Sequence, residues 1–260
     1  MAYFKVPQFK GIAPQVSPRL LAEGFAQTAQ NVELDSGRLV PIEADSATVL
    51  SGITPSTLQS VNKRSVWLYI DGADASKKWL QGVDNIYQDF MRGPIANDAF
   101  DRVYWTGDTY PQFGLGATMI AETPYPTASY RLGLPAPAAA LSVSKSGTAD
   151  ATQIPNDVSY VYTYVDGVGA EGPPSPPSAI VSITDTETVA LSSIAAVPAV
   201  PNGVGSYYLN AAKKRIYRSN TGTENTQFQF LAEIAYTATA YTDTTDADEL
   251  GEVLPSSTWI

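Results

Sequence analysis

Apolar and polar residues alternate along several short stretches of the chain, and a period of two is typical of β-strands that bury one face. The clearest stretch is SYVYTYV at 159–165, where three tyrosines alternate with valine and threonine. Shorter stretches of the same kind predict further strands, at 66–70, 102–105, 179–183, 188–191, 215–218, 228–234 and 240–242. We therefore expect a mainly β protein.

The N-terminal residues follow a different pattern. Three prolines among residues 1–20 prevent a regular helix, so we expect an extended arm there. The apolar side chains of this arm need a covering surface, on their own domain or on a neighbouring subunit. They include Phe4, Phe9 and Ile12. Apolar positions near one face predict one short helix at 20–31, and VELDSGRLVP predicts a hairpin at 32–41.

Proline and glycine positions indicate how the chain divides. They crowd residues 109–130, which predicts loop, and two further prolines predict an extended linker at 130–137. We therefore expect a β-rich assembly domain at 1–132 and a second domain at 133–260. Seven or so short strands over about 115 residues, with turns between them, are typical of a β-sandwich.

The composition supports this fold class and removes several kinds of chemistry. The 15 tyrosines favour pleated, half-buried surfaces, and the 19 glycines and 19 prolines suit the turns that many short strands need. The sequence contains no Cys and no His. Disulfides, thiolate metal sites and a Ser-His-Asp triad are therefore excluded, and we expect no cofactor, no metal and no enzymatic activity. An enzyme based on paired carboxylates or on lysine stays open from the residues alone.

The charge of the chain bears on its partners. The formal net charge is −10, and such a surface repels phosphate backbones, so we expect no direct sequence-specific nucleic-acid binding. The N-terminal residues lack the apolar core of a secretory signal, and no apolar stretch approaches the about 20 residues that span a membrane. We therefore expect no membrane insertion, and synthesis in a cytoplasm.

Two groups of acidic residues are candidates for chemistry. The C-terminal stretch DTTDADELGE places carboxylates close together, as calcium sites do, but its spacing departs from the calcium-loop consensus. A solvated acidic edge is the simpler interpretation. Catalytic carboxylate pairs need to face one cleft, which a sequence does not reveal. The candidates for such pairs are Glu43, Asp45, Asp84, Asp89, Asp98, Asp101 and Asp108.

The remaining motifs favour structural roles. GLGATM and DGVGAEG lack the Lys-Thr or Lys-Ser that a phosphate-binding loop requires, so we interpret both as turns. The basic run Lys213, Lys214 and Arg215 is expected to be a solvated edge before a strand, or a contact to an acidic neighbour. Trp259 and Ile260 are large and apolar, and a pocket on another subunit would cover them.

The residues after about 138 carry a first resemblance. A proline-rich start (LPAPAAALSV), an aromatic second strand (YVYTYV), the connection GAEGPPSPPS, then KRIYRSN and a final YTDT make this part similar to a fibronectin type III domain. The resemblance implies a β-sandwich, and the carboxylates of DTTDADELGE give it an acidic C-terminal tail. The tryptophan usual in the second strand is missing, so Tyr160 or Tyr162 would have to fill that core position.

A second resemblance extends over nearly the whole chain. The segments FKGIAPQVSPRLL, AQTAQNVELDSGRLVP, PIANDAFDRVYWTGDTYPQ, YRLGLPAP and YTDTTDADELGEVLP are similar to those of virion proteins of tailed bacteriophages. The resemblance implies a structural protein of the virion, assembled at the neck or tail, in a collar or nozzle. Its partners would be its own copies, in a homo-oligomer, and other neck or tail proteins. A glycan- or host-surface-binding tail module is the alternative, because exposed aromatics and sandwich loops can hold sugars.

Overall fold

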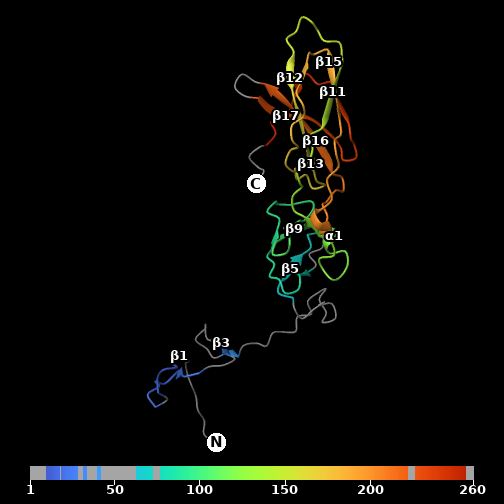
Figure 1. Ribbon diagram of the computed structural model, residues 1–260. Helices are drawn as coiled ribbons and strands as arrows, with labels where there is room; N and C mark the ends of the chain where they lie inside the picture. Colours follow the sequence, from blue (N-terminus) through green and yellow to red (C-terminus); the bar gives the residue numbers. More distant parts are fainter. Residues whose placement is uncertain are drawn as a thin grey trace. The chain divides into compact units, whose positions relative to one another are not determined.

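The computed structural model describes residues 10–17, 19–28, 32–33, 40–41, 63–72, 77–221 and 226–255. Contacts divide the chain into two units, Met1–Val49 and Leu50–Ile260. Strands predominate in the described residues of both units (Figure 1), which confirms the expected mainly β class. No helix within these ranges is long and apolar enough to cross a membrane. The domain boundary expected after residue 132 stays a prediction.

The N-terminal unit contains two pairs of very short strands. β1 (Gly11–Ile12) pairs in parallel with β2 (Phe25–Ala26). β3 (Val32–Glu33) pairs antiparallel with β4 (Val40–Pro41). The antiparallel pair confirms the strand pairing of the hairpin expected at 32–41.

The short helix expected at 20–31 is wrong for the residues that the structure describes there. Residues 19–28 form turns and the strand β2. Gly24 takes a φ of +92°, which lies outside the right-handed helical region and suits a turn that returns the chain towards β1. In the described ranges the single α-helix is α1 (Gly116–Met119), which is one turn long.

The first part of the larger unit is a hairpin and a four-stranded sheet around one core. β5 (Val66–Ile70) pairs antiparallel with β6 (Lys77–Gln81). The antiparallel sheet has the order β10–β9–β8–β7, with bounds Phe90–Arg92 for β7, Val103–Trp105 for β8, Gln112–Gly114 for β9 and Tyr130–Arg131 for β10. The core includes side chains with no exposed surface, namely Tyr69, Leu80, Val103 and Met119. The strands predicted at 66–70 and 102–105 are confirmed.

The loop expected at 109–130 is wrong in part, because this stretch contains β9 and α1. Its glycines at 114 and 116 allow close packing where the sequence suggested turns. A β-carbon on Gly114 would lie 2.7 Å from Met119 Sδ, and one on Gly116 would lie 2.6 Å from the Tyr69 hydroxyl. Real β-carbons show no contacts this short, so a larger residue at either position would force the Met119 or the Tyr69 side chain to move.

The second part of the larger unit is a β-sandwich, as expected. One sheet has the order β11–β15–β18 and the other β13–β16–β17, and all neighbours are antiparallel. β12 pairs separately with β14. The bounds are Ser142–Gly147 (β11), Asn156–Val158 (β12), Tyr160–Val165 (β13), Val181–Ile183 (β14), Glu187–Ser192 (β15), Lys213–Thr221 (β16), Thr226–Ala235 (β17) and Tyr241–Asp243 (β18). These bounds confirm all six strands predicted between 159 and 242.

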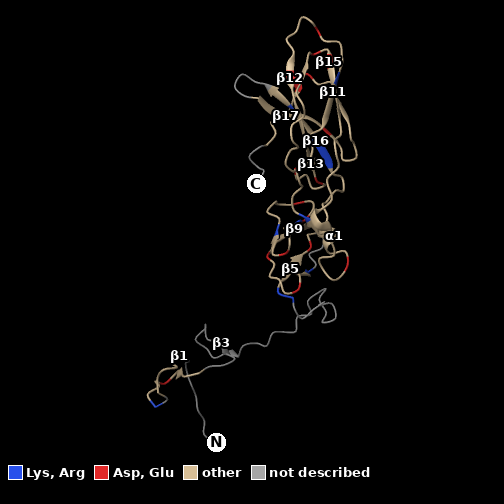
Figure 2. Cartoon of the chain, in the orientation of Figure 1, with Lys and Arg blue, Asp and Glu red and all other residues tan. Residues whose placement is uncertain are grey.

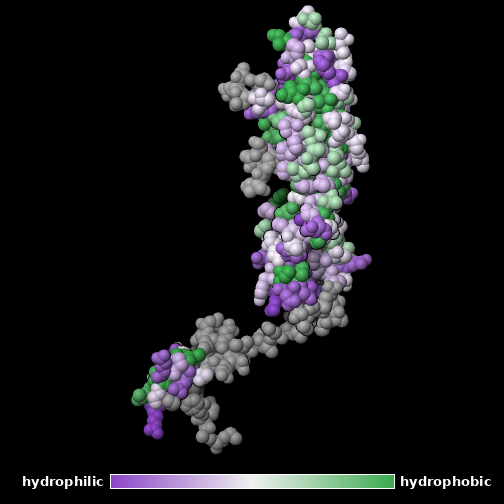
Figure 3. Space-filling view, in the orientation of Figure 1, coloured by the Kyte–Doolittle hydropathy of each residue, from purple (hydrophilic) through white to green (hydrophobic). Residues whose placement is uncertain are grey.

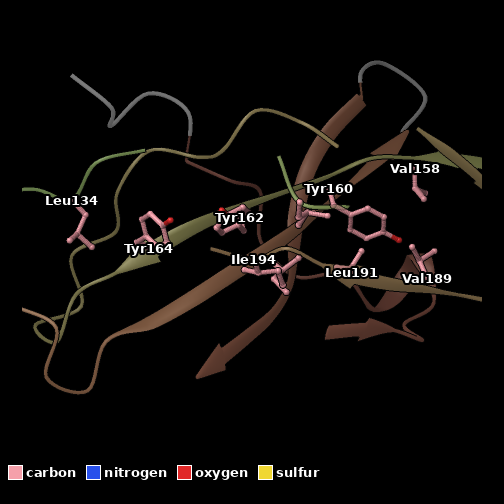
Figure 4. Packing of buried hydrophobic residues seen from close by; sticks show 10 residues of the cluster. Leu134, Val158, Tyr160, Tyr162, Tyr164, Val189, Leu191 and Ile194 are labelled. Atoms are coloured by element: carbon pink, nitrogen blue, oxygen red, sulfur yellow. The ribbon is translucent and has the colours of Figure 1, made fainter. Parts of the chain in front are cut away.

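The core between the two sheets is rich in tyrosine. Tyr160, Tyr162 and Tyr164 of β13 are almost completely buried and lie in a row beside Leu191 and Ile194 (Figure 4). The Tyr162 and Tyr164 rings meet edge to face, with centroids 5.8 Å apart. Tyrosine therefore fills the core of this strand, while the closer likeness to a fibronectin type III domain stays a prediction.

Both edges of the β13–β16–β17 sheet are covered by irregular segments of the same chain. The N–H groups of Gly172, Ser175 and Ser178 donate to the carbonyls of the three β13 tyrosines at 2.8–2.9 Å. The prolines between them have no N–H to donate. This segment therefore pairs with β13 but does not form a hydrogen-bonded ladder with another strand on its outer side. At the other edge, residues 251–254 exchange backbone hydrogen bonds with β17.

Aromatic side chains connect the four-stranded sheet to the sandwich. Tyr104, Phe113 and Tyr130 are cross-strand neighbours on one face, with successive ring centroids 6.1 and 5.7 Å apart. Tyr130 continues the row to Tyr208 of the sandwich, at 4.9 Å. The Arg131 N–H also donates to the Ser206 carbonyl at 2.8 Å. Ring packing and a backbone hydrogen bond therefore join these two parts of the larger unit.

Candidate functional site

The candidate catalytic carboxylates Asp98 and Asp101 are each held by an arginine. Arg102 Nε donates to Asp98 Oδ2 at 2.6 Å, and Arg92 Nε donates to Asp101 Oδ1 at 2.9 Å. The hydroxyl of Tyr69, a residue with no exposed surface, also donates to Asp101. Both carboxylates therefore make structural contacts at the rim of a pocket of about 690 Å³.

These contacts shift the pKa values of the groups involved. Burial raises the pKa of Asp98, but hydrogen bonds from the Arg102 side chain and from two backbone N–H groups outweigh it and hold the pKa below its usual value. Burial and the bond to Asp101 raise the pKa of the Tyr69 hydroxyl. A general acid at neutral pH needs a carboxyl group with a raised pKa, so Asp98 is unsuited to that role.

The other carboxylate candidates do not form a pair in the described residues. Lys63 Nζ lies 2.9 Å from Asp84 Oδ1 in an ion pair. Asp108 accepts from Gln112 Nε2 at 3.1 Å, and Asp89 is exposed. Two candidates lie outside the described residues, namely Glu43 and Asp45.

The acidic C-terminal stretch divides into a buried residue and a solvated edge. Asp243 Oδ2 accepts from Arg218 Nη1 and from the Tyr160 hydroxyl, each at 2.8 Å. Burial and the Asp243 charge raise the pKa of Tyr160. The solvated edge expected here is therefore wrong at Asp243, whereas it is confirmed by the exposure of Asp248 and Glu249. Within the described ranges no three acidic side chains are arranged to hold a metal ion.

The basic run lies within the central strand β16 (Figure 2), so the solvated edge expected before a strand is wrong. Lys213 forms an ion pair with Glu233, and Arg215 pairs with Glu171 at 2.8 Å. Lys214 is 1% exposed, and its Nζ donates to two backbone carbonyls at 2.8 and 3.1 Å. Burial lowers the pKa of this lysine. The run therefore contacts acidic side chains of its own sheet and the sandwich interior.

A second pocket, of about 280 Å³, lies at one end of the sandwich. It is bordered by the β12–β14 pair, the end of β16 and the residues that follow β18. Arg218 lines it and is 4% exposed. Nη1 of Arg218 also donates to the Thr245 carbonyl at 2.7 Å, while its Nε is buried without an acceptor. This pocket therefore borders a buried arginine and has a rim of acidic side chains.

The pocket was not predicted, although the sequence contains a signal for part of it. Strand alternation in β16 places Lys214 and Arg218 on the same face as Ile216, which points into the core. A charged residue at an inward position needs an internal partner. The partner Asp243 lies 25 positions away, and the sequence offers no rule that pairs them.

The predicted interface residues fall mostly outside the described ranges. Ile12 lies in β1 and is 41% exposed. The structure gives no description of the other four, Phe4, Phe9, Trp259 and Ile260. Their role in an interface therefore stays a prediction.

No protein-family model matches the chain, and no curated protein is significantly similar to it.

Proposed function

We propose that the chain is a structural protein of a tailed bacteriophage particle, assembled at the neck or tail through protein–protein contacts. The bacteriophage part of this proposal rests on the sequence segments that resemble virion proteins. The assembly part is supported by the described residues, above all by the surface of the N-terminal unit.

The single observation that carries the assembly role is the apolar surface of the N-terminal unit. Ile12, Val16, Leu20 and Phe25 are 41%, 38%, 79% and 39% exposed. Figure 3 shows hydrophobic and hydrophilic residues close together on the visible face of this unit. These four large apolar side chains are exposed within a short stretch, residues 12–25, and such a stretch favours burial against a partner.

The described carboxylates support a role without bond-making chemistry. Asp98 and Asp101 bind arginines, Asp84 binds a lysine, and Asp243 is buried in an ion pair. Each of these groups stabilises the fold through its contacts. We therefore propose that the side chains of this protein hold proteins together and catalyse nothing.

The assembly role is tested by incorporation of variants into particles. Leu20→Asp and Ile12→Asp place a charge on the proposed contact surface and should sharply lower the amount of chain in purified particles. Ile154→Asp is the matched control, because Ile154 is 89% exposed in the sandwich and lies outside the N-terminal unit. Equal incorporation of all three variants would contradict the proposal.

The C-terminal pair Trp259 and Ile260 is tested in the same way. Deletion of both residues should weaken incorporation if a neighbouring subunit covers them. Unchanged assembly after this deletion rules out their part in the interface.

The free protein is expected to be monomeric, because ordering an apolar arm is unfavourable until a partner covers it. Mass photometry of the isolated chain tests this point. Stable closed rings in dilute solution would contradict assembly triggered by the particle.

A further inference from the structure

The outer side of β5 has no partner strand within the described ranges, where its sheet contains β5 and β6 alone. In antiparallel pairing, residues of hydrogen-bonded pairs direct their backbone groups at the partner strand, and the residues between them direct theirs away. The Gly82 N–H donates to the Ser65 carbonyl at 2.8 Å, so these two residues form such a pair. The N–H and C=O groups of Val66, Leu68 and Ile70 therefore face away from β6, and no described residue bonds to them there.

Several other sheet edges are covered by the protein's own chain. Tyr125 lies along the outer side of β6, and its carbonyl accepts from the Gln81 N–H at 2.9 Å. The outer side of β10 is covered at Arg131, whose N–H donates to the Ser206 carbonyl. Both edges of the β13–β16–β17 sheet are covered in the same way. Within the described residues, the outer side of β5 lacks such cover.

The sequence of β5 suits pairing with another strand. VWLYI consists of β-branched, aromatic and leucine side chains, without charge, proline or glycine. Edge strands that stay unpaired usually carry a lysine, a proline or a bulge, and β5 contains none of these. Val66 and Ile70 are 41% and 44% exposed, so both ends of the strand reach the surface. This edge therefore favours the addition of a strand from outside the chain.

A second copy of the chain presents a strand that fits this edge. Two β5 strands pair antiparallel about a two-fold axis when Leu68 lies opposite Leu68 of the other copy, and Val66 then lies opposite Ile70. All three pairs are hydrogen-bonded, because these are the residues whose backbone groups face outward. Arg64 precedes the strand and Asp71 follows it. Antiparallel pairing brings these opposite charges together at both ends, whereas parallel pairing would bring like charges together.

We propose that two copies of this chain pair through β5, antiparallel and centred on Leu68, and so join two β5–β6 hairpins into one four-stranded sheet. The proposal rests on the assembly role, because it names one contact between copies. A five-residue strand is small against the about 20–30 residues that each partner contributes to a stable interface. The pairing therefore forms where copies are held close together, as in a particle, and dissociates in dilute solution.

Cysteine cross-linking of the full chain tests the pairing and its register. The chain contains no cysteine, so an introduced thiol is the only one present. In the proposed pair the two Leu68 α-carbons lie about 5.5 Å apart, which a disulfide spans. Two Val66 residues lie four positions out of register, roughly 14 Å apart, which is too far for a disulfide. Under mild oxidation of concentrated protein, Leu68→Cys should therefore form dimers at least about tenfold faster than Val66→Cys.

A mixture of two variants keeps the test independent of the fold at Leu68. Val66→Cys and Ile70→Cys change exposed residues, which lie opposite each other in the proposed pair. Mixed in equal amounts, they should cross-link at least about tenfold faster than either variant alone. Equal rates for the mixture and the single variants overturn the proposal. A Leu68→Cys rate no higher than that of Val66→Cys, in protein that keeps the wild-type circular dichroism spectrum, also overturns it.

A charge on the strand provides a matched control. In the Leu68→Cys background, Ile70→Lys places a second cation near Arg64 of the other copy and should slow cross-linking about tenfold. Ile95→Lys introduces the same charge at a residue that is 58% exposed and lies between β7 and β8, and it should leave the rate unchanged. Equal slowing by both substitutions would contradict pairing through β5. Because the assay uses isolated protein, its failure leaves incorporation of the N-terminal variants into particles as a separate question.

Discussion

Replacing Asp243 by asparagine is expected to destabilise the sandwich strongly. The Asp243 side chain is 1% exposed and the Arg218 side chain is 4% exposed, with 2.8 Å between Oδ2 and Nη1. Asparagine keeps the size of the side chain and one acceptor, but it removes the negative charge. Arg218 then remains a buried cation without a counter-charge, and Tyr160 loses a charged acceptor.

The magnitude follows from the burial of the pair. Breaking a buried ion pair by removing one partner costs about 3–5 kcal/mol. For a unit of about 200 residues, 1 kcal/mol corresponds to roughly 2–4 °C in Tm, so the midpoint should fall by roughly 6–20 °C. Asp248→Asn is the matched control, because an exposed substitution usually changes stability by less than about 0.5 kcal/mol.

Thermal and urea unfolding followed by circular dichroism measures both variants. A loss in Asp243→Asn no larger than that in Asp248→Asn would refute the account of the buried pair. The double variant Arg218→Met, Asp243→Leu provides a second check. It should recover much of the loss, since removing both charges removes the uncompensated cation.

Three further substitutions test other parts of the fold. Ser175→Ala removes the hydroxyl that accepts from the buried Tyr162 N–H of β13, so the free energy of unfolding in urea should fall by about 1–3 kcal/mol. The control Ser144→Ala changes an exposed residue and should leave that free energy almost unchanged. Gly107→Ala should destabilise more than Gly133→Ala in the same assay; both glycines have positive φ, but only at Gly107 would the new β-carbon meet a backbone oxygen, at 2.2 Å. Burial raises the pKa of Asp98, but hydrogen bonds lower it by more, so the folded pKa lies below the unfolded value near 3.9. The ionised Asp98 carboxylate therefore stabilises the fold above that unfolded value, and this stabilisation is lost as pH falls through the folded pKa. Thermal midpoints of the wild type should therefore fall more steeply below about pH 4 than those of Asp98→Asn, and parallel curves would contradict this.

Strand positions in the sandwich could be predicted because one face of each strand enters a core. The alternation in β13 placed its three tyrosines on one side, and the structure buries all three. The same pattern gave no sign that the opposite face is also buried. Val161 is covered by Leu254, which comes from residues that follow β18, and such tertiary cover is not encoded in local alternation.

Glycine was the least reliable signal, because it serves two purposes. At Gly114 and Gly116 it permits close approach of side chains inside a sheet and a helix, and the sequence suggested turns there. At Gly24, inside the helix expected at 20–31, the positive φ excludes a right-handed helix. A turn and a packing site both select glycine, so the residue type alone does not distinguish them.

The pocket at the end of the sandwich could not be predicted, because its parts are distant in sequence. The Tyr160 hydroxyl and Asp243 are 83 positions apart, and Arg218 lies between them. Acidic residues in a chain of net charge −10 are common, so their presence near a loop carried no information. Only the folded strands bring a buried arginine beside them.

The most direct test of the structural role is electron microscopy of purified bacteriophage particles that carry a gold-labelled form of this chain. Label concentrated at the neck or tail is the expected result. Particles that lack the chain altogether, or label scattered without relation to the neck or tail, would contradict it.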